Sequence, residues 1–147
     1  MQGARFHFVN FCLMMLGYAN IYESVFMFVN CSKTKVIPWP LPGYALFELS
    51  VQSQLAYSFV FTALYIPFVL VGVSFLNYAY LREGVANDMN LWFPFFMASM
   101  AMPLTFALLN TLQRKTPIDM FTAASLAIVF LAVIVRYWKH IAGALFS

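Results

Sequence analysis

The sequence predicts an all-α integral membrane protein, folded as a single membrane domain with about four transmembrane helices. Of its 147 residues, 63% are hydrophobic and only 9% are charged, whereas about a quarter of a soluble domain is charged. The few charges leave uncharged stretches of 33 residues at 49–81, 25 at 89–113 and 16 at 120–135. A hydrocarbon layer about 30 Å thick is crossed by roughly 20 apolar helical residues. Spans are therefore expected at about 6–29, 55–80, 91–112 and 118–138.

The first span, 6–29, is the most polar of the four because it contains Asn10, Asn20 and Glu23. A helix lying on the membrane surface is the alternative. Such a helix carries its apolar residues on one stripe. Here apolar residues occur on all sides, and this favours insertion.

The segment 30–54 between the first two spans is expected to lie at the membrane interface. It contains three prolines between positions 38 and 42, and proline removes backbone donors and holds the preceding residue extended. An extended arm is therefore predicted, followed by a short amphipathic helix over 43–54. The apolar face of this helix, at helical spacing, would consist of Tyr44, Phe47 and Val51.

The second and third spans are expected to be kinked by proline. Pro67 lies near the middle of the second span with Gly72 close by, and Pro103 lies inside the third. Pro94, in contrast, suits the first turn of a helix. Two polar reversals are predicted, one after each span. The first consists of Arg82, Glu83, Gly84 and Asp88, and the second of residues 113–117, with Pro117 starting the fourth helix.

Aromatic and basic residues at the ends of the spans are typical of interfacial anchors. The basic residues do not decide the orientation, because four fall on each side of a four-span topology: Arg5, Arg82, Arg136 and Lys139 against Lys33, Lys35, Arg114 and Lys115. The expected anchors are Trp39, Trp92, Arg136, Trp138 and Lys139.

Glu23 is the sharpest candidate for chemistry, since a carboxyl group inside a span is costly and is often functional. Proton or ligand chemistry is one interpretation. Structural pairing, with Tyr22, Tyr18 or a neighbouring subunit, is the interpretation that we favour. Asn20 and Asn77 are the other intramembrane polar candidates.

His7 and His140 are the only histidines, and a four-span topology places both at one membrane face. Paired histidines can hold haem in a helical bundle, but both of these are terminal, so ordinary interfacial histidines are expected. No metal-ligand spacing or catalytic constellation is present. Neither a metal, a cofactor nor enzymatic activity is therefore predicted.

Small residues on the third and fourth spans are expected to allow close packing between helices. They are Ala98 and Ala101 on the third and Ala123 and Ala127 on the fourth.

These features favour a small, non-catalytic accessory subunit of a larger membrane complex, with other membrane subunits and lipids as its partners. Scattered basic residues argue against nucleic acid. A respiratory-chain or ATP-synthase assembly of the mitochondrial inner membrane is the complex we expect, and no cleavable signal is predicted in the opening MQGARFHF. The alternatives are a transporter or channel component that uses Glu23 in a polar path, and a haem- or quinone-associated membrane anchor.

Overall fold

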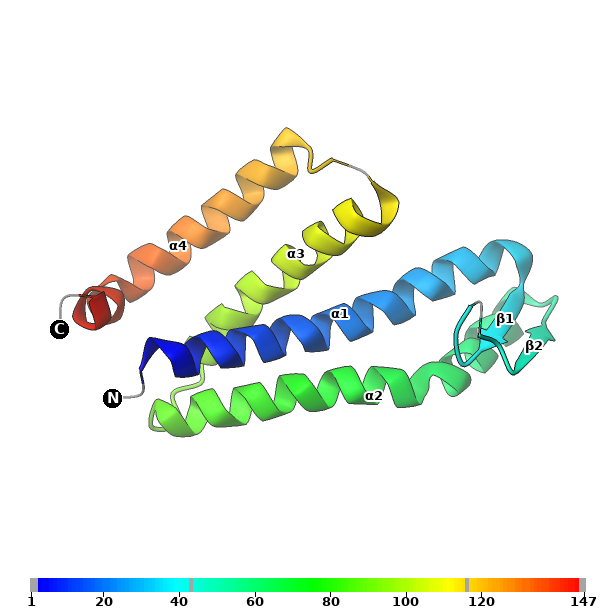
Figure 1. Ribbon diagram of the computed structural model, residues 1–147, viewed down its shortest axis with the longest axis horizontal. Coiled ribbons are helices and arrows are strands. Elements are labelled where there is room, and N and C mark those ends of the chain that lie inside the picture. The colour runs from blue at the N-terminus through cyan, green and yellow to red at the C-terminus, as the bar shows by residue number, and fades with distance from the viewer. Residues whose placement is uncertain (1–2, 43, 116, 146–147) are drawn as a thin grey trace.

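The computed structural model describes residues 3–42, 44–115 and 117–145, without the side chains of Arg114, Tyr137 and 139–145 (Figure 1). Three helices are long and apolar enough to cross a membrane, and the continuous part of α4 described with side chains, Met120–Arg136, is shorter. By this criterion the chain is a helical integral membrane protein, while a fourth crossing stays a prediction. The elements are α1 (Ala4–Thr34), β1 (Val36–Trp39), β2 (Phe47–Ser50), α2 (Gln54–Ala86), α3 (Trp92–Arg114) and α4 (Met120–Leu145).

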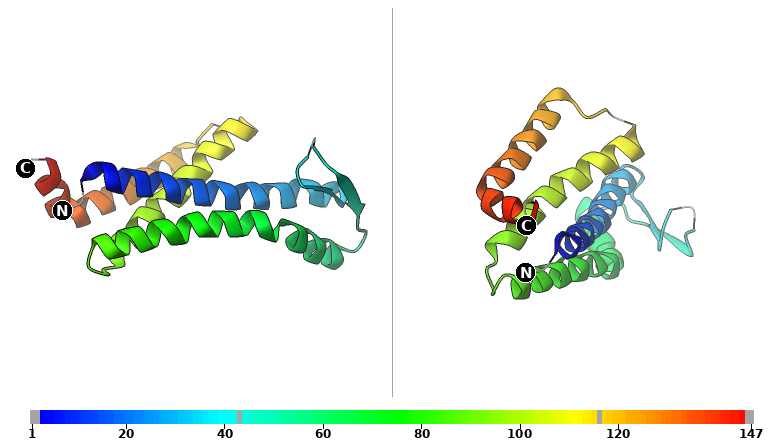
Figure 2. Two further views of the ribbon diagram at one scale, coloured as in Figure 1. Left: turned by 60° about the horizontal axis from the view of Figure 1, so that its bottom comes forward. Right: turned by 60° about the vertical axis from the view of Figure 1, so that its left-hand side comes forward.

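Helices α1 and α2 lie side by side and antiparallel over most of their length, and α3 crosses α1 at an angle (Figures 1 and 2). Helix α4 returns along α3 on the side away from α2. The start of α1 and the end of α2 therefore lie at one end of the bundle. The two strands lie at the other end.

Two glycines, Gly17 and Gly72, make a close contact between α1 and α2. A Cβ atom on Gly17 would lie 2.7 Å from the carbonyl oxygen of Gly72, and one on Gly72 would lie 2.8 Å from that of Gly17. Real Cβ atoms do not approach backbone oxygens so closely. Glycine at both positions is what allows the helix backbones to approach.

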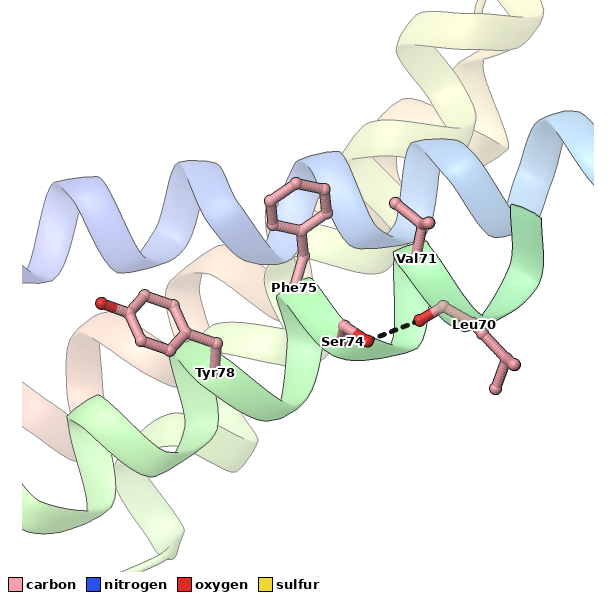
Figure 3. A pocket seen from close by; sticks show the side chains of 5 residues that line it. All are labelled: Leu70, Val71, Ser74, Phe75 and Tyr78. Atoms are coloured by element: carbon pink, nitrogen blue, oxygen red, sulfur yellow. Dashed lines mark hydrogen bonds between the residues drawn. The ribbon is translucent and has the colours of Figure 1, made fainter. Parts of the chain in front are cut away.

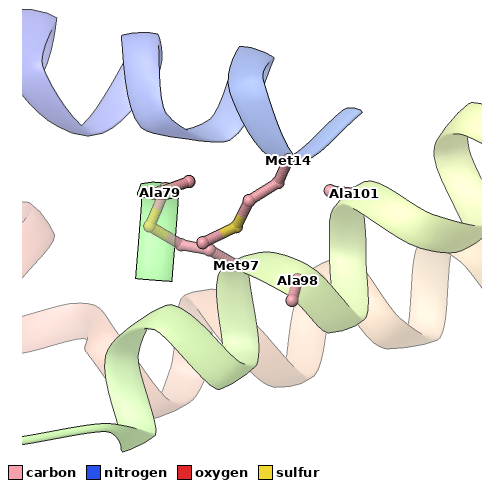
Figure 4. Packing of buried hydrophobic residues seen from close by; sticks show 5 residues of the cluster. All are labelled: Met14, Ala79, Met97, Ala98 and Ala101. Atoms are coloured by element: carbon pink, nitrogen blue, oxygen red, sulfur yellow. The ribbon is translucent and has the colours of Figure 1, made fainter. Parts of the chain in front are cut away.

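A compact core joins the first three helices (Figure 4). Met14 of α1 packs against Ala79 of α2 and Met97 of α3, and the small residues Ala98 and Ala101 complete this cluster. Alanines let α3 approach closely while the flexible methionines fill the remaining space.

The prediction of a short helix over 43–54 is wrong, because Phe47–Ser50 is a strand that pairs antiparallel with Val36–Trp39. Trp39 pairs with Phe47, and their rings stack with centroids 5.5 Å apart. The pairing satisfies backbone groups that the neighbouring prolines keep out of a helix. Contacts between separate segments therefore outweigh the helical spacing of the apolar residues.

Hydrogen bonds fasten this hairpin to α2. The Tyr65 hydroxyl donates to the carbonyl oxygen of Pro38, and the Trp39 indole nitrogen donates to that of Leu64 at 3.1 Å. Trp39, expected to be an interfacial anchor, is thus half-buried against α2. Ile37 of β1 is buried in one cluster with three aromatic side chains of α2, which are Tyr57, Phe61 and Tyr65.

Replacing Tyr65 with phenylalanine is expected to loosen the hairpin, because the buried carbonyl of Pro38 loses its donor. An unsatisfied buried acceptor costs about 1–3 kcal/mol. Hydrogen exchange at 36–39 and 47–50 should therefore become faster. Tyr44→Phe is the control, since Tyr44 is 83% exposed. Equal exchange rates in the two variants would contradict this role for Tyr65.

Several helix ends differ from the expected boundaries. Helix α1 continues to Thr34, and α2 continues to Ala86, so the polar turn expected at Arg82–Gly84 is wrong. The fourth helix begins at Met120 rather than at Pro117. Just before this start, the Asp119 side chain accepts a hydrogen bond from the Thr122 amide at 2.7 Å. Pro67 and Pro103 both lie inside helices, and kinks there stay predictions.

Candidate functional site

A cluster of polar side chains surrounds a buried glutamate where α1 begins and α2 ends. Glu83 is completely buried. His7 Nδ1 lies 2.8 Å from Glu83 Oε2, and Asn10 Nδ2 donates to Oε1 at 2.6 Å. Asn87 Nδ2 adds a longer contact of 3.3 Å to Oε2. We call His7, Asn10, Glu83 and Asn87 the Glu83 cluster.

Helical spacing brings these four side chains together. His7 and Asn10 are three residues apart on α1, and Glu83 and Asn87 are four apart at the end of α2. Both spacings place side chains on one helix face. Asn87 also ends α2, where its backbone amide donates to the Glu83 carbonyl oxygen at 3.0 Å. The antiparallel packing of α1 and α2 then sets the two polar faces against each other.

Within the Glu83 cluster both carboxyl oxygens of Glu83 have hydrogen-bond partners, but one other buried acceptor lacks a partner among the described residues. A buried carboxyl group is tolerated only when it is hydrogen-bonded or paired, and both Glu83 oxygens have partners. Asn10 Oδ1 is buried and has no hydrogen-bond partner among the described residues. The site is therefore held by a nearly complete polar network, in which loss of Asn10 would leave Glu83 Oε1 without its hydrogen bond.

His7 also faces an apolar groove of about 320 Å³ between α1, α3 and α4. Its ring packs edge-to-face against the ring of Phe93, with centroids 5.0 Å apart. A histidine held by a buried carboxyl group thus forms part of an otherwise apolar wall. The rest of the wall includes Phe8, Phe11, Phe93, Phe96, Met100 and Phe130.

A second groove, of about 400 Å³, lies on the outer face of α2 (Figure 3). A single helix supplies all its lining residues, and the Ser74 hydroxyl donates to the carbonyl oxygen of Leu70 at 2.8 Å. Since no other helix encloses it, this groove has the character of a lipid-contact surface. It is lined by Leu70, Val71, Ser74, Phe75 and Tyr78.

The intramembrane polar residues expected from the sequence face different neighbours. Glu23 is half-exposed and accepts a hydrogen bond from Gln113 of α3. Asn20 lies against Gly72 of α2, and its buried Oδ1 has no partner among the described residues. Asn77 is exposed. The three side chains do not converge on one polar path.

The expected anchors and packing residues are placed as follows. Trp92, Arg136 and Trp138 are exposed, and so are Ala123 and Ala127. The side chains of Lys139 and His140 lie outside the described residues, so the suggested pairing of His7 with His140 is not tested. Ala98 and Ala101 are buried in the three-helix core.

Sequence reasoning missed Glu83, which it assigned to a turn. The available signal was the pair of polar spacings, His7 to Asn10 and Glu83 to Asn87, at the ends of two apolar stretches. No group of three or more histidine, cysteine or acidic side chains that could hold a metal occurs within the described part of the chain. Comparisons with protein-family models, curated proteins and solved structures find no match to this chain.

Proposed function

We propose that this protein is a small, non-catalytic accessory subunit of a larger membrane complex, with α4 as a principal contact with its partners. The observation that carries this proposal is the exposure of α4. Between 120 and 136 it buries none of its described side chains, although most are apolar. Its main described contact within the chain is with α3. The remaining surface is available to another subunit.

Small residues on α4 favour a protein neighbour over lipid alone. Ala123 and Ala127 are one helical turn apart, and both are exposed. Small side chains let a second helix approach closely, and van der Waals packing of this kind drives helix association in a bilayer. The same residue type is buried on α3, at Ala98 and Ala101, where α3 packs against α1 and α2.

The length of the first two helices also supports a covering partner. Helices α1 and α2 have 31 and 33 residues, which is about 46–50 Å at 1.5 Å per residue, whereas the hydrocarbon layer is about 30 Å thick. Apolar side chains stay exposed near the hairpin, including Leu46 and Leu55. Tilting of the helices reduces the mismatch between their length and the thickness of the hydrocarbon layer. A neighbouring subunit would cover the apolar side chains that remain outside this layer.

The mitochondrial inner membrane, in a respiratory-chain or ATP-synthase assembly, is the location that we propose. This rests on the small size and hydrophobic composition of the chain, which are common among accessory subunits of such assemblies, and its 17 Phe and 9 Met residues are unexceptional there. It also rests on the four-to-four distribution of basic residues, which suits a subunit whose orientation partners help to set.

Photo-crosslinking tests the proposal. A photoreactive residue at Ile128, which is 67% exposed, should crosslink to specific proteins, and the chain should migrate on native gels in a large complex. Ala123→Leu with Ala127→Leu should release the chain from that complex. The same change at exposed Ala63 of α2 is the control and should not. Migration as a lone protein of 16.8 kDa plus detergent would overturn the proposal.

A further inference from the structure

We propose that Arg82, near the end of α2, binds the phosphate of an anionic phospholipid whose acyl chain lies along the outer groove of α2. A specific lipid site of this kind goes beyond the structural role proposed above and does not depend on it. The proposal rests on three features of Arg82. They are the surroundings of its guanidinium group, its contact with a residue that lines the groove, and its depth in the membrane.

Two aromatic rings hold the guanidinium group of Arg82. Its central carbon lies 4.7 Å from the ring centroid of Phe6 on α1 and 5.5 Å from that of Tyr78 on α2. Both distances fall within the range of cation–π attraction. The two rings fix the position of the charge, but they give its five N–H donors no oxygen acceptor. The group is thus oriented, with its strongest hydrogen bonds still to be made.

Within the described part of the chain, no acidic side chain pairs with Arg82. The ion pair found there joins His7 to Glu83. Although Glu83 is the next residue, it is buried, and its two oxygens are bonded to His7 and Asn10. The half-buried Arg82 has no hydrogen-bond acceptor for its guanidinium group among the described residues. A charge held in this way favours an anion from outside the chain, and a phosphate can accept two parallel N–H bonds from one guanidinium group.

Arg82 lies at the depth where a bilayer carries its phosphate groups. The uncharged stretch 49–81 ends one residue before it, so Arg82 marks the boundary of the hydrocarbon layer on α2. Arg5 adds a second positive charge at the same end of the bundle, where α1 begins. Basic residues at this level attract anionic lipid headgroups.

The outer groove of α2 begins beside Arg82 and extends toward the middle of the bilayer (Figure 3). Tyr78, whose ring contacts the Arg82 guanidinium group, also lines the groove. The lining residues, at 70–78, come 4 to 12 positions before Arg82, which is about 6–18 Å along a helix. Half of the hydrocarbon layer is about 15 Å thick. An acyl chain attached to a phosphate at Arg82 would therefore lie along this groove.

Other ligands match one part of the site and not the other. A free phosphate or a soluble phosphate ester would meet the guanidinium group but leave the apolar groove empty. A sterol would cover the groove without bringing an anion. A zwitterionic phospholipid carries a cation beside its phosphate, which the positive charges of Arg82 and Arg5 oppose. An anionic phospholipid matches both the charge and the groove.

Binding is tested by native mass spectrometry of the full chain in neutral detergent, with phosphatidylglycerol and phosphatidylcholine of identical acyl chains as the probes. We expect one molecule of phosphatidylglycerol per chain, bound more tightly than phosphatidylcholine. Arg82→Gln removes the charged donors, and should weaken the binding of phosphatidylglycerol by about tenfold and abolish the preference. Ser74→Trp fills the groove from an exposed position and should also weaken this binding.

The matched controls are Arg5→Gln, which removes an exposed charge at the same end of the bundle, and Ala63→Trp, which adds bulk to α2 outside the groove. Both should leave the affinity for phosphatidylglycerol unchanged. Thermal unfolding shows whether each variant is folded, and Ser74→Trp keeps the test decisive if Arg82→Gln is unstable. Equal affinity for the two lipids in the unmodified chain would overturn the proposal. So would an equal loss in Arg82→Gln and Arg5→Gln, or displacement of the lipid by glycerol phosphate at the same concentration as by unlabelled phosphatidylglycerol.

Discussion

Replacing Glu83 with alanine should lower the free energy of unfolding by about 3–5 kcal/mol, the range for removing one partner from a buried charged network. The change removes the acceptor of His7 and of Asn10 at once, and it leaves a cavity at a completely buried position. Asn10 already has one buried oxygen without a partner, so the variant would strand its amide nitrogen as well. Unfolding in mixed micelles with increasing dodecyl sulfate, followed by circular dichroism, measures the loss.

Glu23→Ala is the matched control for that experiment. Glu23 is also a helical glutamate, but it is half-exposed, and among the described residues its hydrogen-bond partner is Gln113. Exposed polar pairs contribute about 1 kcal/mol or less. If both alanine variants unfolded at the same dodecyl sulfate concentration, burial of the Glu83 cluster would not be what stabilises this end of the bundle.

Replacing Gly17 with alanine should cost about 3 kcal/mol, the upper part of the range for overpacking. The new Cβ would lie 2.7 Å from both the carbonyl oxygen of Gly72 and Cγ of Leu76. A backbone oxygen in a packed helix cannot move aside, so α1 and α2 must separate. Alanine favours the helix by about 1 kcal/mol over glycine, which only partly offsets the clash. The same unfolding titration provides the measurement.

Gly84→Ala is the control, because Gly84 is also a buried glycine of α2. A Cβ atom there would meet only Cδ2 of Leu91, at 3.3 Å, and the end of a leucine side chain can shift. Unchanged or slightly raised stability is expected, by up to about 1 kcal/mol. A loss as large as that of Gly17→Ala would show that helix packing at the glycine pair is not the cause.

Much of the fold could be predicted from the distribution of charge. The thickness of a bilayer fixes how many apolar residues a crossing helix needs, so uncharged stretches such as 49–81 locate the long helices. Helix ends were less accurate, because charged residues do not by themselves end a helix. Arg82 and Glu83 lie inside α2, where partners on α1 and aromatic rings accommodate them.

The hairpin and the candidate site could not be predicted in the same way, since each depends on segments far apart in the sequence. Phe47 pairs with Trp39, and Tyr65 of α2 holds the strand that contains Trp39. Glu83 is buried where α1 brings His7 and Asn10 to it. Local spacing shows which residues share one side of each contact. The residues on the other side come from a separate segment, and only the packing of the two segments brings them together.

The Glu83 cluster has a consequence for biosynthesis. His7 and Asn10 leave the ribosome 76 and 73 residues before the glutamate that they bind. At about 5–20 residues per second, the polar face of α1 waits for several seconds without its partner. The first two helices are therefore expected to be released into the bilayer together, as a preformed pair.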